Sequence, residues 1–211
     1  MRTRIKICGI TSPEIASIAV GAGADAIGLM FYPKSSRYLE LEQAEAIRKV
    51  LPAFVSSVAV FVNPTPDYVQ AVVERLGTEL LQFHGEESPE FCAGFRRPYV
   101  KVIRVDDHTD LDSEVAKYPD AAAIMLDTRH ESAYGGTGIR FDWELAAGSG
   151  FAHLVLAGGI DHGNVGEAIS LVKPFAVDVS SSVETDGVKD AGKIQKFCRA
   201  VREADSNGEV Q

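Results

Sequence analysis

Short apolar runs alternate with amphipathic segments along the whole chain. An apolar run of this kind indicates a buried strand, and apolar positions three and four residues apart indicate a helix packed against a sheet. The pattern predicts eight strands, over Arg4–Ile10, Ala26–Phe31, Ser57–Val62, Leu80–His84, Tyr99–Val105, Ala122–Asp127, His153–Ala157 and Phe175–Val179. A helix-like segment follows each strand, for example Leu41–Leu51, Pro66–Leu76, Ser88–Phe95, Val165–Val172 and Ala191–Ala204.

Several of these helices carry their own start signals. A capping hydroxyl is paired with proline in the first turn at Ser12-Pro13, Thr65-Pro66 and Ser88-Pro89. Eight βα units of about 25 residues each predict an α/β protein with a single (β/α)8 TIM barrel. A doubly wound sheet would carry a glycine-rich dinucleotide turn after the first strand, and none is present there. We expect one barrel domain over residues 1–205 and a frayed tail over 206–211.

Composition and charge argue against several classes of binding partner. The 211 residues are 45% apolar, which excludes wholesale disorder. A net charge of −9 argues against nucleic acid or an anionic membrane surface as a partner. No apolar run approaches the ~18 residues of a membrane span, and no signal peptide precedes the first strand. Three cysteines without CxxC spacing fit reduced thiols, so we expect a cytoplasmic protein. The helix faces do not distinguish a monomer from a homodimer.

Cys8 is the one cysteine at a strand end. Cys92 and Cys198 fall within predicted helices, where a buried apolar role is the better interpretation. The C-terminal ends of barrel strands are where this fold places its chemistry. A strand-end cysteine is nevertheless more often inert than reactive, so Cys8 alone does not decide between the two.

Strand parity gathers further polar residues at the same end of the barrel. Side chains alternate faces along a strand, so if Cys8 points inward Lys6 does too, although Lys6 lies deeper. Asp127 ends an otherwise apolar strand, and the edge of a dry interior favours a protonated carboxyl suited to a general acid. A capping or loop-bracing aspartate is an equally good interpretation of Asp127 alone. Asp178 points inward on the eighth strand.

Two turns look like phosphate cradles. Gly158 and Gly159 follow the seventh strand, and Ser180 and Ser181 follow the eighth. The loops after these two strands form the usual phosphate site of a TIM barrel, through backbone N–H groups and a helix N-terminus. Either turn alone is weak evidence, because glycines often only make turns. Both turns at these positions predict a phosphate site.

Three more loops supply candidate substrate-binding residues. Arg37 follows the second strand and offers a planar fork suited to a carboxylate or phosphate. Gly136 lies in a long Gly-rich loop after the sixth strand, which could cover Asp127 or be only a surface connection. His84 closes the fourth strand. The histidines show no metal-ligand spacing, so we expect no metal.

These segments, in this order, resemble the phosphoribosylanthranilate isomerase family of tryptophan biosynthesis. The resemblance runs from about Lys6 to Phe197. Its segments are KICGIT, FYPKSSR, LQFHGEE, LDT with GGTG and FDW, LAGG with NV, and VDVSS with VE, G and KD. The chain departs from the family's common pattern at Ser36, Ser182 and His162, which leaves the geometry of the arginine loop and of the phosphate turn open.

The resemblance implies an Amadori rearrangement of N-(5′-phosphoribosyl)anthranilate without metal or organic cofactor. It implies that Cys8 is the general base and Asp127 the general acid. Arg37 would bind the anthranilate carboxylate, and Asp178 would lie near the sugar hydroxyls. Gly158, Gly159, Ser180 and Ser181 would hold the phosphate, with His84 and Gly136 as further substrate contacts.

Other functions remain as alternatives at this point. A related barrel isomerase acting on the histidine-pathway aminoaldose, or on both substrates, would be expected to use a carboxylate in place of Cys8. A metal-dependent sugar-phosphate epimerase would need convergent histidine and aspartate ligands. A non-catalytic barrel that binds an anionic metabolite would keep the phosphate turns but would not need both Cys8 and Asp127.

Overall fold

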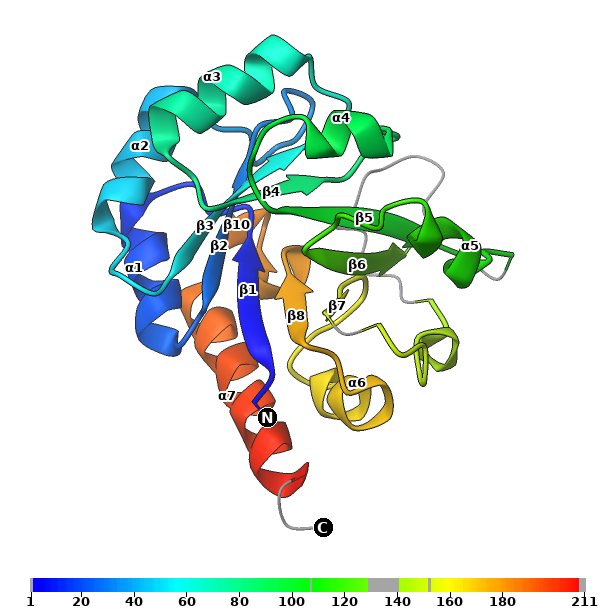
Figure 1. Ribbon diagram of the computed structural model, residues 1–211. Coiled ribbons are helices and arrows are strands. Elements are labelled where there is room, and N and C mark those ends of the chain that lie inside the picture. The colour runs from blue at the N-terminus through cyan, green and yellow to red at the C-terminus, as the bar shows by residue number, and fades with distance from the viewer. Residues whose placement is uncertain (1, 107, 129–140, 152, 209–211) are drawn as a thin grey trace.

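Eight parallel strands close into a barrel in the computed structural model, which describes residues 2–106, 108–128, 141–151 and 153–208 (Figure 1). The strands are β1 (Arg4–Cys8), β2 (Ala26–Met30), β3 (Ser56–Phe61), β4 (Leu80–Phe83), β5 (Tyr99–Val105), β6 (Ala123–Thr128), β7 (Leu154–Leu156) and β8 (Ala176–Val179). Each strand pairs with the next along the chain, and β8 pairs with β1. The predicted TIM barrel is confirmed.

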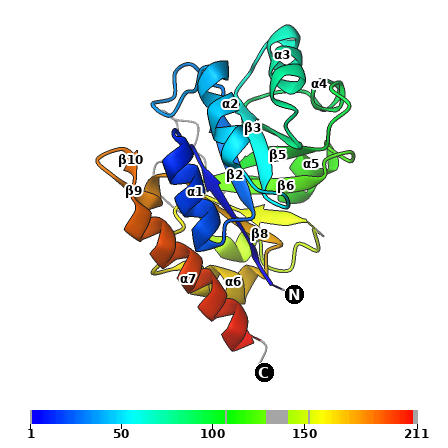
Figure 2. The same ribbon diagram turned by 90° about the vertical axis from the view of Figure 1, so that its left-hand side faces the viewer.

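Helices surround the barrel and return the chain to the start of the next strand. They are α1 (Pro13–Ala22), α2 (Leu41–Val50), α3 (Pro66–Leu76), α4 (Pro89–Ala93), α5 (Leu111–Ala116), α6 (Val165–Val172) and α7 (Ala191–Gly208), with short 3-10 helices η1 (Trp143–Leu145) and η2 (Ser181–Val183). A small hairpin, β9 (Glu184–Thr185) and β10 (Val188–Lys189), separates η2 from α7. Figure 2 shows α1 and α7 side by side, with this hairpin near the start of α7.

The side chains of the barrel strands alternate between inward and outward positions, and the two sets form separate apolar regions. Residues such as Ile5, Ile7 and Leu126 point outward and pack under the helices. The inward set is smaller and includes Val58, Val60, Val102 and Met125 in the barrel interior. The outward-facing side chains hold the helices against the sheet, because both the strand and the helix side chains remove apolar surface from water where they touch.

The predicted helix starts are confirmed, and the strand boundaries lie within one residue of the sequence pattern except at the end of β1. The hydroxyl of Ser12 accepts a hydrogen bond from the N–H of Ile15, 3.3 Å away, as an N-cap. Strand β1 ends at Cys8 rather than Ile10 because Gly9 turns the chain with a φ of +73°. In the described part of the connection between β6 and β7, residues 141–151, the only helical element is η1.

Helix α7 continues to Gly208 rather than ending at Ala204. The carboxylate of Asp205 accepts hydrogen bonds from the backbone N–H of Thr3 at 2.8 Å and from its hydroxyl at 2.7 Å. These bonds attach the last turns to the start of β1, which the polar composition of this segment did not indicate. No helix within the described ranges is long and apolar enough to cross a bilayer.

Candidate active site at the C-terminal end of the barrel

One pocket opens where the barrel strands end. Its wall includes nine of the ten site residues predicted from the sequence: Cys8, Arg37, His84, Asp127, Gly158, Gly159, Asp178, Ser180 and Ser181. The tenth, Gly136, lies outside the described residues. The barrel therefore brings together side chains from β1, β6 and β8 and from the loop that follows β4, which are far apart in the sequence.

Cys8 is a buried thiol inside a cluster of charges. Its side chain points into the barrel, and the residue is 6% exposed. Two positions before it, the Lys6 ammonium donates to the Asp178 carboxylate across a 2.9 Å contact. Burial raises the pKa of Cys8 above its ordinary value, and the positive charge of Lys6 opposes that shift. The inward parity predicted for Cys8 and Lys6 is confirmed, and Lys6 is close enough to act on the thiol.

Asp127 lies on the opposite side of the pocket from β1. One of its oxygens accepts a hydrogen bond from the N–H of Thr128 at 2.8 Å. The other is 3.1 Å from Nε2 of His84, but the ring N–H does not point at it, so the contact is one of proximity rather than an aligned hydrogen bond. His84 Nε2 therefore has a donor or acceptor position left over for a ligand in the pocket.

Gly158 makes the close approach of the β7 turn to Asp127 possible. It has a φ of +75°, and a Cβ built on it would lie 2.7 Å from Asp127 Oδ1 and 2.5 Å from the hydroxyl of Thr128. The amide side chain of Asn164 donates to the carbonyl of Gly159 at 2.8 Å and braces the same turn. The turn thus presents backbone directly to the pocket beside the carboxyl group.

The serine turn after β8 is tied to β1. The hydroxyl of Ser180 donates to the carbonyl of Cys8 at 3.1 Å. The Lys189 ammonium, buried under the β9–β10 hairpin, donates to the carbonyl of Ser180 at 3.1 Å. The predicted phosphate turn is therefore joined to the backbone that carries the thiol and lies next to a buried positive charge.

Arg37 is held by a carboxylate that the sequence interpretation did not assign. Its Nε and Nη2 donate to the two oxygens of Glu184, each at 2.6 Å, in a bidentate pair. Glu184 also forms an ion pair with Lys189. Burial alone would raise the pKa of Glu184, but the hydrogen bonds from Arg37 and Lys189 lower it below its ordinary value. One edge of the guanidinium is thus fixed by the protein, and Arg37 lines the pocket.

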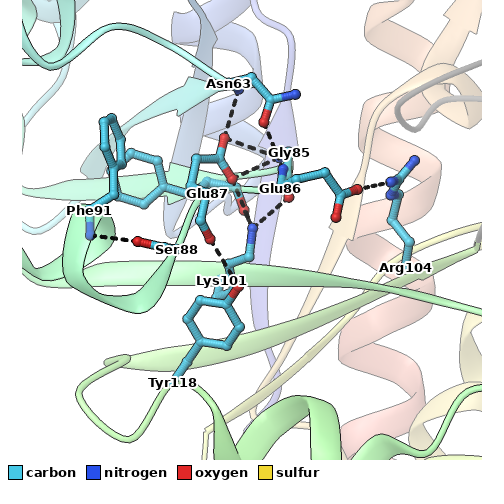
Figure 3. A network of polar contacts seen from close by, with 10 residues as sticks. Asn63, Gly85, Glu86, Glu87, Ser88, Phe91, Lys101, Arg104 and Tyr118 are labelled. Atoms are coloured by element: carbon cyan, nitrogen blue, oxygen red, sulfur yellow. Dashed lines mark hydrogen bonds and ion pairs between the residues drawn. The ribbon is translucent and has the colours of Figure 1, made fainter.

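The loop that carries His84 rests on a second buried ion pair, shown in Figure 3. Lys101 on β5 donates to Glu87 at 2.8 Å and to the carbonyl of Gly85 at 2.6 Å. The same carboxylate accepts from the backbone N–H groups of Asn63 at 2.8 Å and of Gly85 at 2.9 Å. Both charged side chains are almost fully buried. This network fixes the chain immediately after His84 and joins the loops that follow β3 and β4.

The residues that the structure describes were also compared with the requirements of a metal site. Among the described residues, no group of three or more histidine, cysteine, aspartate or glutamate side chains could hold a metal ion. The polar groups that line the pocket in these residues include a thiol, two carboxyl groups, an imidazole and a guanidinium.

Sequence reasoning found the pocket residues but missed those that hold them. Glu184 and Lys189 belong to the VE and KD segments of the resemblance, yet nothing in their spacing predicts a contact with Arg37 or Ser180. Glu87 and Lys101 lie on separate elements and meet only in the folded barrel. The available signal was a lysine within an apolar strand, because a buried charge requires a partner.

Sequence comparisons give one consistent family. Residues 5–200 match the family model described as N-(5'phosphoribosyl)anthranilate (PRA) isomerase. The N-(5'-phosphoribosyl)anthranilate isomerase of Pseudomonas aeruginosa (strain LESB58) is 50% identical over 200 residues, covering 94% of this chain and 95% of that protein. The enzyme of the same name from Leptothrix cholodnii is 47% identical over 206 residues, covering 97% and 93%.

Solved structures agree with the sequence relatives. Phosphoribosyl anthranilate isomerase from Thermotoga maritima superposes with a TM-score of 0.88 at 40% identity, over 95% of this chain and 99% of that one. A phosphoribosyl anthranilate isomerase in complex with reduced 1-(o-carboxyphenylamino)-1-deoxyribulose 5-phosphate has a TM-score of 0.84 at 40% identity, with the same coverage.

Proposed function

Since this chain belongs to the N-(5′-phosphoribosyl)anthranilate isomerase family, we propose that its pocket catalyses the Amadori rearrangement of N-(5′-phosphoribosyl)anthranilate to 1-(2-carboxyphenylamino)-1-deoxyribulose 5-phosphate in tryptophan biosynthesis. The observation that carries the residue assignment is the meeting of Cys8 and Asp127 in one pocket. A thiol and a carboxyl on opposite sides of a barrel mouth provide the base and the acid that this isomerisation needs.

Asp127 acts first, as the general acid. Its carboxyl group protonates the ring oxygen of the furanose, the bond between that oxygen and C1′ breaks, and the anthranilate nitrogen forms a protonated Schiff base with C1′. The hydrogen bond from the N–H of Thr128 orients the carboxyl group, and Nε2 of His84 lies 3.1 Å from its other oxygen. The barrel interior on one side and the β7 turn on the other limit the access of water to it.

Cys8 then acts as the general base. Its thiolate removes the proton from C2′, and the electron pair of that C–H bond neutralises the Schiff base to give an enolamine. Tautomerisation to the ketone moves a proton from the C2′ hydroxyl to C1′. Each turnover thus leaves the proton on Cys8 and the charge on Asp127, and exchange with solvent resets both groups.

The two anionic groups of the substrate bind at separate parts of the pocket. The phosphate is held by N–H groups of the turns at Gly158-Gly159 and Ser180-Ser181, near the buried Lys189 ammonium. Arg37 holds the anthranilate carboxylate with the N–H groups that Glu184 leaves free. These local donors offset the unfavourable field of a chain with a net charge of −9.

Two further substrate contacts complete the proposal. Asp178 lies near the sugar hydroxyls, and His84 donates to a substrate oxygen. The same proposal places the enzyme in the cytoplasm, as a monomer or homodimer, with no metal or organic cofactor.

A fluorescence assay that follows the loss of the anthranilate substrate tests the function. The wild-type protein should turn over this substrate, while the histidine-pathway aminoaldose, assayed in parallel, should not react, because that chemistry favours a carboxylate in place of Cys8. Turnover of the aminoaldose alone would replace the proposed function, and turnover of both would make the enzyme bifunctional. Absence of both activities in a folded protein would favour a metabolite-binding barrel.

A further inference from the structure

Cys8, Lys6 and Asp178 form a contiguous group that the mechanism above uses only in part. Strands β8 and β1 are in register, so that Lys6 pairs with Asp178 directly. All three residues are buried. A lysine ammonium, a carboxylate and a thiol therefore share one small region of the barrel interior, away from bulk water.

Gly28 shows how close the thiol and the ammonium are. It pairs with Cys8 in the β1–β2 register. A Cβ built on Gly28 would lie 2.7 Å from Cys8 Sγ and 3.1 Å from Lys6 Nζ. Both atoms thus border the same point, which only a residue without a side chain leaves open. The same Cβ would lie 2.9 Å from the Cα of Cys8, so the close approach of the β1 backbone also requires a glycine here.

We propose that Lys6 is a positioning residue that stabilises the thiolate of Cys8, that Asp178 competes with the thiolate for the Lys6 ammonium, and that Gly28 keeps the space in which the thiol and the ammonium meet. The proposal rests on the proposed function for its catalytic meaning, since Cys8 must lose its proton to pocket water before it can accept the proton of C2′. Lys6 itself touches no reacting atom.

The electrostatics of the group support this assignment. Burial raises the pKa of Cys8, Lys6 lowers it through its charge and hydrogen bonding, and the charge of Asp178 raises it. Burial lowers the pKa of Lys6, but the charges of Asp178 and Cys8 outweigh burial and raise it, so the lysine stays charged at neutral pH. Lys6 and Asp178 therefore act on the thiol with opposite signs.

The other charges around Cys8 do not replace Lys6. Lys189, from the β9–β10 hairpin, also lowers the pKa of Cys8, but its effect on that pKa is smaller than the effects of Lys6 and Asp178. Arg37, from the loop after β2, interacts with the same thiol and is paired with Glu184. Both of these cations form ion pairs with the one carboxylate of Glu184, and neither lies on β1, whereas Lys6 lies on the same strand face as the thiol.

The rate of Cys8 alkylation by iodoacetamide, measured without substrate between pH 6 and 10, tests the proposal. Peptide mass spectrometry resolves Cys8 from Cys92 and Cys198, which are fully buried in the core and report any loss of folding by becoming labelled. At pH 7, Asp178→Asn should raise the Cys8 rate at least about tenfold, and Lys6→Met should lower it at least about tenfold, each corresponding to one unit in the thiol pKa. Rates within twofold of wild type, or changes of the same sign in both variants, would overturn the proposal.

A double variant keeps the test decisive if Lys6→Met does not fold because Asp178 is left unpaired. Lys6→Met/Asp178→Asn removes both charges and should react at least about tenfold more slowly than Asp178→Asn alone; equal rates would reject the role of Lys6. Gly28→Ala should move the midpoint of the pH profile upward, while Gly21→Ala, on a helix with open space around it, should leave it unchanged. Because no substrate is present, these results are independent of whether the protein isomerises N-(5′-phosphoribosyl)anthranilate.

Discussion

Replacement of Gly158 by alanine should reduce catalysis through a defined displacement of Asp127. The added Cβ would lie 2.7 Å from Asp127 Oδ1, against a carbon–oxygen contact distance of about 3.3 Å. The carboxyl group or the turn must therefore move by about 0.6 Å. If a misplacement of 1 Å costs about 100-fold in rate, this displacement lowers kcat about 16-fold.

Gly77→Ala is the matched control for backbone strain. Gly77 ends α3 with a φ of +60°, and an added Cβ would meet nothing within 4 Å. Both variants lose about 1–2 kcal/mol of stability to the left-handed backbone, but only Gly158→Ala adds the cost of overpacking, about 1–3 kcal/mol. Urea denaturation and the fluorescence assay measure the two effects. Equal kcat values in both variants, at full occupancy by substrate, would refute the argument that Gly158 fixes the position of Asp127.

Three further predictions concern the groups around the pocket. Arg37→Ala should raise KM about 10- to 150-fold with little change in kcat, because a charge-assisted hydrogen bond contributes about 1.5–3 kcal/mol; an unchanged KM in steady-state kinetics would remove its role. Lys101→Met should lower the free energy of unfolding by about 3–5 kcal/mol by leaving Glu87 buried and unpaired, and Lys101→Met/Glu87→Gln should recover much of the loss in urea denaturation. The free energy of unfolding should fall as the pH rises above about 9, because burial raises the pKa of Cys92 to about 12 and of Cys198 to about 11, so the thiols of the unfolded chain lose their protons first. Cys198→Ala should reduce the slope of this pH dependence, and a free energy of unfolding that stays constant to about pH 11 would contradict the prediction.

The barrel itself could be predicted from local pattern because its strands are short apolar runs that end where the helices begin. The two largest shifts have different causes: Gly9 ends β1 early through its own left-handed backbone, and Asp205 extends α7 by bonding to Thr3. Local composition contains no information about the contact between Asp205 and Thr3.

Some residues of the candidate site could be predicted from the sequence and others could not. Cys8, Asp127 and the turns after β7 and β8 follow from strand order, because parallel strands in a barrel end at one face. The residues that contact and hold them cannot be predicted from strand order. Glu184 reaches Arg37 only because the β9–β10 hairpin folds over the barrel mouth, and Gly28 contacts Cys8 only through the register of two strands. Long-range pairing of this kind is fixed by the closed barrel and not by the spacing of residues along the chain.

The catalytic role of Cys8 is tested most directly by kcat of the Cys8→Ala variant, together with its affinity for the reduced product analogue bound in the related isomerase. Removal of a general base should lower kcat by about 10²- to 10⁴-fold. The affinity for the analogue should stay within a few-fold of wild type, because the phosphate turns and Arg37 remain in place. A kcat within a few-fold of wild type would contradict the assignment of Cys8 as the base that removes the C2′ proton.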